Sequence, residues 1–193
     1  MIEETQLNMM NPFIPRTHEG EGESDPASEK PASPSAALTR AQEVEKSLRK
    51  RFHKEIFSKF AKAINEYQLV QENDRIAVCI SGGKDSMLMA KLFQELQKHR
   101  KVSFDLEFLV MDPGYLKRNR QLIEENAARL GIPICVFETE IFDAVYEIEK
   151  SPCYLCARMR RGHLYSQARE IGCNKIALGH HYDDVIETIL MGM

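Results

Sequence analysis

Short apolar runs alternate with helical stretches over most of this 193-residue chain. The apolar runs, which we expect to form strands, are Ile76–Ile80, Leu106–Met111, Ile134–Phe137 and Lys175–Leu178. The helical stretches are Ser86–His99, Asn119–Leu130, Ile141–Glu149, Cys156–Ile171 and Asp184–Met191. A helix between two strands returns the chain to the same end of the sheet, so successive strands run parallel. The pattern predicts an α/β fold with a doubly wound, mostly parallel sheet and helices on both faces.

Residues 1–37 differ in composition from the rest of the chain. They hold five of the eight prolines, and seven acidic residues against two basic ones, although the whole chain carries a net charge of only −3. The segment has few apolar side chains to bury, and segments of this kind do not form a packed core. We expect residues 1–37 to form a disordered, acidic, proline-rich tail.

An apolar repeat of four residues begins after the tail. Its members are Val44, Leu48, Phe52, Ile56, Phe60 and Ile64. Apolar residues at helical spacing mark one side of an α-helix, and the other positions of this stretch are rich in Lys and Arg. We therefore expect residues 38–70 to form one long, basic, amphipathic helix. Two interpretations stay open: a solvated helix packed on the domain, or a basic arm that contacts phosphates.

The hexapeptide Ser81-Gly82-Gly83-Lys84-Asp85-Ser86 joins a predicted strand to a predicted helix. Two adjacent glycines allow a tight turn, and the start of the helix offers free backbone N–H groups to an anion. Lys84 adds a positive charge, and the two serines add hydroxyl donors. The segment is not a Walker-type P-loop, because Val78 and Asp85 stand where that motif needs Gly and Ser or Thr. We expect this loop to bind phosphate groups.

Two further clusters carry polar and thiol side chains. They are Ser151-Pro-Cys-Tyr-Leu-Cys-Ala-Arg-Met-Arg-Arg-Gly162 and Ala177-Leu-Gly-His-His-Tyr-Asp-Asp-Val-Ile-Glu-Thr188. The pair Cys153 and Cys156 alone fits half of a zinc site, a redox pair or two ligands of an iron–sulfur cluster. Asp183 and Asp184 are hard oxygen ligands suited to Mg²⁺, and Asp184 also suits the cap of the next helix.

The three motifs together resemble one known family. The hexapeptide matches the signature loop of the PP-loop ATP pyrophosphatases at every position. The later clusters match the C-x-x-C-x-R-x-R-R-G and A-L-G-H-H-x-D-D-x-x-x-T patterns of one branch, the tRNA 2-thiocytidine synthetases. The resemblance extends from Val44 to Met193, and it implies a PP-loop ATP-binding domain of the adenine nucleotide alpha hydrolase type at residues 71–193.

The resemblance also implies roles for single residues. Residues 81–86 are expected to hold the β- and γ-phosphates of ATP, with Asp112 and Gly179 beside the nucleotide. Asp183 is expected as a catalytic carboxylate and magnesium ligand, and Arg160 as a stabiliser of charge at the α-phosphate. Cys153 and Cys156 are expected as ligands of a [4Fe-4S] cluster. For Asp112, which begins an Asp-Pro-Gly sequence, a turn-forming role is the alternative.

The reaction that the family resemblance implies is 2-thiolation of a cytidine in the anticodon loop of tRNA. ATP adenylates the C2 oxygen, pyrophosphate leaves, and sulfur then displaces AMP. The implied partners are tRNA and a sulfur donor such as a cysteine desulfurase. No apolar run approaches the roughly 20 residues that span a bilayer, and the N-terminus lacks the pattern of a secretory signal. We therefore expect a cytoplasmic protein without membrane contact.

The family pattern continues beyond this sequence, with a further strand and a second C-x-x-C that brings the third cluster ligand. We therefore expect a sheet that is incomplete at its C-terminal edge and open to homodimer formation, weak ATP binding and no stable cluster. One alternative is a truncated, non-catalytic fragment that binds nucleotide. Another is a ligase similar to the tRNA lysidine synthetases, which share the SGGKDS loop and an H-H-x-D-D motif but do not need the two cysteines.

Overall fold

The computed structural model describes residues 38–99, 101–142 and 152–193. The predicted tail at residues 1–37 lies outside them, as does the predicted helix Ile141–Glu149 apart from its first two residues.

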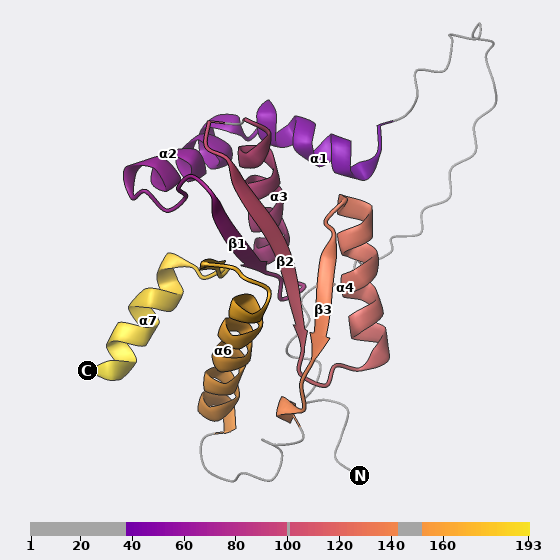
Figure 1. Cartoon of the computed structure of the whole chain (residues 1–193), viewed down its shortest axis with the longest axis vertical. Helices are drawn as coiled ribbons and strands as arrows, with labels where there is room; N and C mark the ends of the chain where they lie inside the picture. Colours follow the sequence, from indigo (N-terminus) through magenta and orange to yellow (C-terminus); the bar gives the residue numbers. More distant parts are fainter. Residues whose placement is uncertain (1–37, 100, 143–151) are drawn as a thin grey trace, which may run out of the picture. The chain divides into compact units, whose positions relative to one another are not determined.

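Four parallel strands form the centre of the fold (Figure 1). They are β1 (Asp74–Cys79), β2 (Phe104–Asp112), β3 (Ile134–Glu138) and β4 (Lys175–Ala177), in the order β3-β2-β1-β4. β1 pairs in parallel with β2 and β4, and β2 pairs in parallel with β3. The predicted α/β class and parallel sheet are confirmed. The direction of winding reverses at β1, because β2 and β3 lie on one side of it and β4 on the other.

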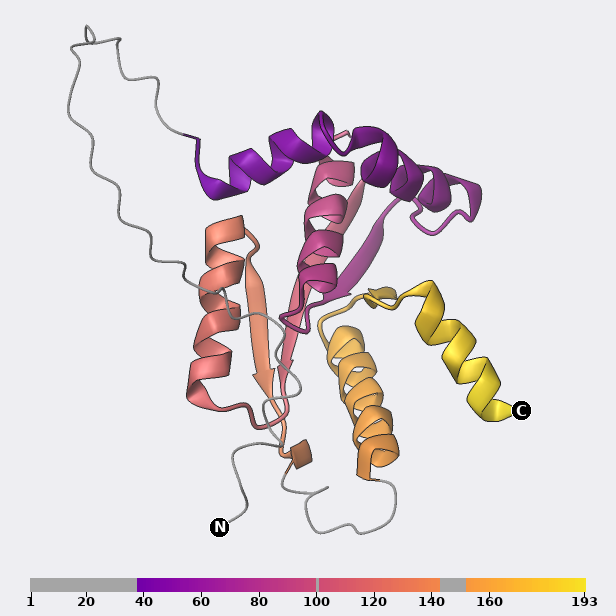
Figure 2. The same cartoon turned by 180° about the vertical axis from the view of Figure 1, so that it is seen from behind.

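Helices cover both faces of this sheet. Ile76 and Val78 of β1 pack on one face with α3 (Lys84–Lys98) and α4 (Lys117–Leu130), the face seen in Figure 2. Ala77 points to the other face, where it packs with Ala168 of α6 (Pro152–Glu170). Side chains alternate between the two faces of a strand, so a continuous apolar run is what a strand buried on both faces requires.

The stretch predicted as one long helix is divided into three parts. α1 (Arg40–Arg49) and α2 (Ser58–Glu66) are joined by a π-helical segment, η2 (His53–Phe57). A strict four-residue repeat drifts by about 40° per repeat around an α-helix of 3.6 residues per turn. The wider π turn takes up part of that drift and keeps Leu48, Phe57 and Ile64 buried. The predicted apolar face is retained in part: Leu48 and Ile64 of the repeat are buried, whereas Phe57, which the repeat does not include, is buried in place of its neighbour Ile56.

α6 begins earlier than the pattern predicted. Its first residue is Pro152, four positions before the predicted start at Cys156. Proline suits the first helical position, because its ring fixes a helical φ and no N–H is needed there. Cys153 and Cys156 therefore lie within the first turns of the helix, three residues apart and on one side of it.

The last described strand is half-buried, and the helix that follows it is exposed. β4 lies at one edge of the sheet that the structure describes, and α7 (Tyr182–Gly192) follows it. Its large exposed apolar side chains are Tyr182, Val185, Ile186, Ile189 and Leu190. None of the helices in the described part of the chain is both long and apolar enough to cross a membrane. Homodimer formation through the open edge stays a prediction.

Candidate nucleotide and cluster site

The loops with the predicted chemistry follow β1 and β4, the two strands where the sheet reverses its direction of winding. Residues 81–86 leave the carboxyl end of β1, and residues 178–184 leave the carboxyl end of β4. In open parallel sheets, ligands bind in the crevice at this position. The fold therefore brings together two segments that lie almost 100 residues apart in the sequence.

The loop after β1 has a tight conformation that depends on glycine. Gly82 has φ +86°, and a Cβ built there would lie 2.7 Å from Cγ1 of Ile123 on α4. Both the backbone conformation and the space exclude a larger residue. Ser86 Oγ donates to the carbonyl of Gly83 at 3.0 Å and accepts from the N–H of Ser81 at 3.2 Å. The two serines therefore hold the loop closed around its backbone.

The start of α3 gives this loop its capacity for anions. Gly83 is the N-cap and makes no side-chain cap, so the first N–H groups of the helix have no such acceptor. These groups carry the partial positive charge of the helix dipole. The Lys84 side chain is 72% exposed and lies 3.2 Å from Asp85 Oδ2, which leaves it free to turn towards a phosphate. Ser81 to Ser86 thus form one backbone-lined anion site.

The loop after β4 contacts this anion site directly. A Cβ on Gly179 would lie 3.5 Å from the backbone N and Cα of Ser86, which is ordinary contact distance. His181 Nε2 lies 3.4 Å from Asp85 Oδ2. Asp184 accepts a hydrogen bond from the backbone N–H of His181 at 2.6 Å, so it caps α7. Asp183, the neighbouring predicted magnesium ligand, is exposed in the first turn of α7.

Asp112 is buried at the carboxyl end of β2 and stabilises the turn that follows. Its Oδ1 accepts from the N–H groups of Gly114 at 3.0 Å and Tyr115 at 2.6 Å. Arg120 Nη1 lies 3.4 Å from the other oxygen, Oδ2. This arrangement matches the turn-forming alternative. Any contact between Asp112 and a nucleotide stays a prediction.

Arg160 is linked to the same turn. Its Nη2 donates to the hydroxyl of Tyr115 at 3.1 Å, which joins α6 to the segment after β2. The ring of Tyr115 packs edge-on against Phe142, with 6.1 Å between centroids. The sequence interpretation did not include Tyr115 or Ile123. The Asp-Pro-Gly sequence just before Tyr115 was a local signal that could have pointed to this residue. No local pattern points to Ile123, because its contact with Gly82 joins two separate elements.

The structure describes the side chain of only one of the two cysteines of α6. Cys156 is half-buried and packs with Met111 at the end of β2 and with Ile141. The side chain of Cys153 lies outside what the structure describes. Two thiols three residues apart on a helix suit the soft ligand set of an iron–sulfur cluster. Among the described side chains, no three of His, Cys, Asp or Glu come together in an arrangement that could hold a metal ion.

Comparison with known proteins agrees with this architecture. Residues 52–193 match a family of PP-loop domains, and the chain belongs to that family. Its relatives include the tRNA-cytidine(32) 2-sulfurtransferase of Citrifermentans bemidjiense, 40% identical over 139 residues. That match covers 70% of this chain and 54% of the relative. The sulfurtransferase of the same name from Shewanella denitrificans is 41% identical over 152 residues, covering 76% of this chain and 45% of the relative.

A solved structure has the same fold. The U34-tRNA thiolase NcsA from Methanococcus maripaludis, solved with its [4Fe-4S] cluster, superposes with a TM-score of 0.57 at 26% sequence identity. The match covers 72% of this chain and 50% of that one. The chain thus spans about half the length of the curated relatives and of this thiolase. The predicted resemblance to the tRNA 2-thiocytidine synthetases is confirmed.

Proposed function

We propose that this protein uses ATP to transfer sulfur to C2 of a cytidine in the anticodon loop of tRNA. The observation that carries the proposal is the contact between the loop of residues 81–86 and the loop of residues 179–184 at the reversal point of the sheet. The first loop is built for phosphate and the second carries the carboxylate of Asp183. The similarity to tRNA-cytidine(32) 2-sulfurtransferases supports tRNA as the substrate.

The first half of the reaction is adenylation of the base. The cytidine C2 oxygen attacks the α-phosphorus of ATP, and the bond to the β-phosphate oxygen breaks. The N–H groups at the start of α3 and the Lys84 ammonium stabilise the charge that develops on the leaving pyrophosphate. Asp183 would hold Mg²⁺ against the phosphates, since carboxylate oxygen is the ligand type that this ion prefers. Arg160 carries a permanent charge that suits the α-phosphate, and its bond to Tyr115 orients it.

The second half replaces oxygen by sulfur. Sulfur at the sulfide level attacks C2, its electron pair forms the C–S bond, and the C2–O bond breaks with AMP as the leaving group. Cys153 and Cys156 would hold two positions of an iron–sulfur cluster, which supplies a bound sulfur when it is present. That the 193-residue chain holds no stable cluster stays a prediction, and iron and acid-labile sulfide measured after anaerobic reconstitution would check it.

The adenylation half is the part to test first. The chain is incubated with millimolar ATP, Mg²⁺ and an unmodified tRNA transcript that contains the cytidine, and pyrophosphate release is measured. We expect release to need both the transcript and Lys84, with Lys117→Ala as a matched control for Lys84→Ala. With a second transcript that has uridine in place of the cytidine, the protein should release much less pyrophosphate. Nucleotide binding without pyrophosphate release in any condition would reduce the proposal to a nucleotide-binding module.

A further inference from the structure

The helices at the amino-terminal side of the domain carry a group of cations that the proposed chemistry does not use. These residues, which we name the basic crest, are Lys46, Arg49, Lys50, Arg51, Lys54, Lys59 and Lys62. We propose that the basic crest binds the phosphate backbone of the RNA substrate, well away from the ATP loop. This inference rests on the proposed function, because that function names tRNA as the substrate.

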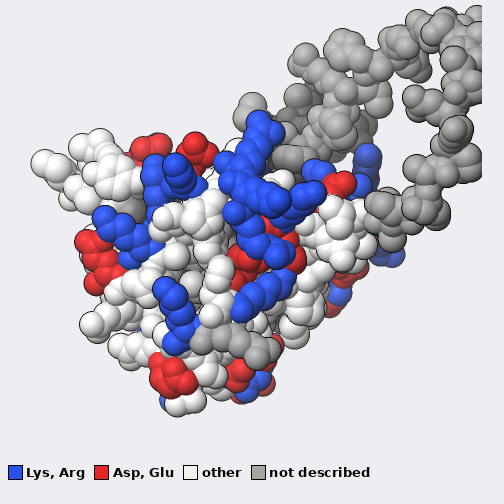
Figure 3. Space-filling view, turned by 90° about the horizontal axis from the view of Figure 1, so that it is seen from above, with Lys and Arg blue, Asp and Glu red and all other residues white. Residues whose placement is uncertain are grey.

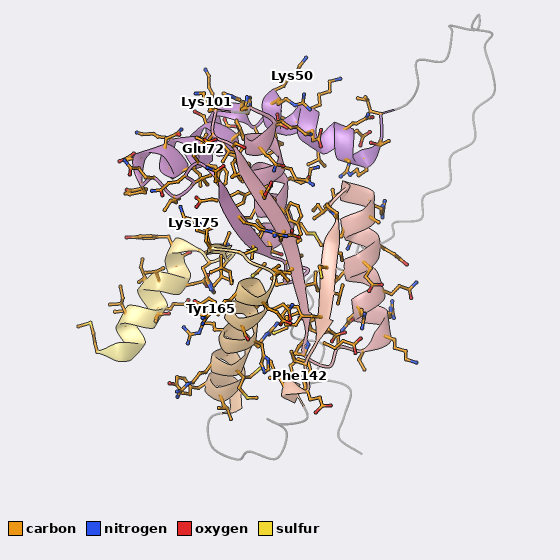
Figure 4. The ribbon with its side chains drawn as sticks, in the orientation of Figure 1. Lys50, Glu72, Lys101, Phe142, Tyr165 and Lys175 are labelled. Carbon is orange, nitrogen blue, oxygen red and sulfur yellow. The ribbon has the colours of Figure 1, made fainter. Side chains whose placement is uncertain are left out.

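The charge of this region stands out from the rest of the molecule. Residues 38–70 carry eight Lys and Arg against four Glu, a net charge of +4 in a chain whose total is −3. All seven crest residues are exposed. Seen from above in Figure 3, Lys and Arg side chains spread over this end of the molecule. Lys50 and the nearby Lys101 project outward from it in Figure 4. Such a field attracts polyanions and raises the rate of their encounter.

Most of the crest is free to bind a partner. Among the described side chains, no carboxylate forms an ion pair with the crest residues other than Arg49. Two acids beside the crest, Glu45 and Glu95, are already paired with cations, whereas Glu55 and Glu66 are exposed and form no ion pair among the described side chains. Glu45 lies 2.9 Å from Lys91 and 2.7 Å from Lys98, and Glu95 lies 3.1 Å from Arg49. These carboxylates therefore fix α1 on α3 and add little repulsion towards a phosphate.

The distance from the ATP loop indicates what kind of anion the crest serves. α2 leads into the amino end of β1, whereas the phosphate loop follows the carboxyl end of the same strand. A strand of six residues separates the two ends by about 20 Å. One nucleotide does not reach that far. A folded RNA presents phosphates at intervals along its whole length, so a single tRNA can contact the basic crest and place one base at the loop.

An RNA fits this surface better than a membrane does. Basic amphipathic helices that lie on bilayers insert exposed large apolar side chains. In the crest, Leu48, Phe57 and Ile64 are turned into the core, and the Arg51 guanidinium lies 5.0 Å from the centre of the half-buried Phe52 ring. The outward face of residues 40–66 is therefore cationic and short of apolar anchors, and the exposed Leu38, Tyr67 and Leu69 lie beyond its two ends. Lys and Arg on such a face bind nucleic acid mainly through phosphates and without sequence preference.

The test compares two triple variants of the whole chain. The crest variant is Lys54→Gln, Lys59→Gln and Lys62→Gln. The control variant removes three exposed cations from α4 and α6, with Arg118→Gln, Arg129→Gln and Arg169→Gln. Affinity for an unmodified tRNA transcript is measured by fluorescence anisotropy between 50 and 300 mM salt. Pyrophosphate release at saturating tRNA and circular dichroism are recorded for both variants, and anionic phosphatidylserine vesicles serve as a second probe.

We expect the crest variant to bind tRNA about 10- to 100-fold more weakly near 0.1 M salt, with a salt slope shallower by about two. The control variant should change affinity less than about threefold. At saturating tRNA the crest variant should release pyrophosphate normally, which separates this inference from the function of the loop. Equal losses in the two variants would overturn the inference, as would binding to vesicles without binding to tRNA. Failure of pyrophosphate release in the unmodified chain, with crest-dependent tRNA binding intact, would count against the proposed function alone.

Discussion

His181 Nε2 lies 3.4 Å from Asp85 Oδ2, and this contact joins the loop after β4 to the phosphate loop after β1. Both side chains are about half exposed, so the contact is worth only about 0–1 kcal/mol of stability. We therefore expect the contact to fix the position of one loop relative to the other rather than to stabilise the fold. A contact of this kind should affect the reaction more than the fold.

Asp85→Asn and His181→Gln test this placement. We expect each substitution to change the free energy of unfolding by less than about 1 kcal/mol, since the pair is exposed. Each should reduce pyrophosphate release several-fold, because the carboxylate of Asp183 is carried by the loop that the pair holds. The double variant should lose no more than the worse single variant. Strictly additive losses in the double variant would mean that the two side chains act independently.

Gly82 and Gly83 provide a matched pair of glycines. Gly82→Ala places a Cβ 2.7 Å from Ile123 at φ +86°, so we expect a loss of about 2–4 kcal/mol from strain and overpacking. At Gly83 the nearest atom to a Cβ is Ser81 Oγ at 3.6 Å, so Gly83→Ala should cost far less. Urea unfolding measures both. On an Ile123→Ala background, which removes the clashing atoms, Gly82→Ala should lose most of its extra cost; an unchanged cost would place its origin in the backbone alone.

Tyr115→Phe removes the hydroxyl that accepts from Arg160. The bond itself should contribute about 0.5–1.5 kcal/mol to stability. If Tyr115 orients Arg160 towards the α-phosphate, the substitution should lower the rate of pyrophosphate release with little change in the KM for ATP. Arg160→Lys keeps a charge but loses the planar donor geometry, so this variant should release pyrophosphate more slowly than Tyr115→Phe. A change in KM alone would assign Tyr115 to nucleotide binding.

The strands and the phosphate loop could be predicted from the sequence, because both depend on local signals, whereas the order of the strands in the sheet was not predicted. A continuous apolar run such as Ile76–Ile80 is what a strand buried on both faces needs, and adjacent glycines mark a tight turn wherever they occur. The π segment at His53–Phe57 could not be predicted, since the same four-residue repeat fits a straight helix over a few turns. Only packing of Phe57 and Leu48 against Leu92 of α3 decides where the helix widens.

The site shows the same division between local and long-range information. The hexapeptide and the GHHYDD segment were found from their own residues. Their contact through Asp85 and His181 follows from the placement of β4 beside β1, which no local pattern contains. The link from Arg160 to Tyr115 likewise joins positions 45 residues apart. The start of α6 at Pro152 was a local signal that the sequence interpretation passed over, as was the Asp-Pro-Gly sequence before Tyr115.

Asp74 gives the fold a specific acid sensitivity. Burial raises the pKa of its carboxyl. Hydrogen bonds from Lys175, from the backbone of Gln71 and from Asn174 together lower the pKa by more than burial raises it, so the pKa lies below its ordinary value. A depressed pKa stabilises the fold above the unfolded pKa of about 3.9, and that stability is lost as the pH falls through the folded value. We expect Asp74→Asn to lower stability at pH 7 by about 1–3 kcal/mol. Urea unfolding from pH 7 to pH 3 should show a smaller decline for the variant; parallel declines would rule out Asp74 as the source.

The cysteines outside α6 should differ sharply in reactivity. Burial at the end of β1 raises the pKa of the Cys79 thiol to about 12, whereas Cys135 is exposed on β3. Only the thiolate reacts with alkylating reagents, so at pH 8 the reactive fraction of Cys79 is about 1 in 10,000. Iodoacetamide followed by peptide mass spectrometry should label Cys135 within minutes and Cys79 only when the chain unfolds. Cys135→Ser should remove the label from that one peptide and leave the slow labelling of Cys79, whose rate then reports opening of the sheet at β1. Fast labelling of Cys79 in the folded chain would mean that β1 is open at the phosphate loop.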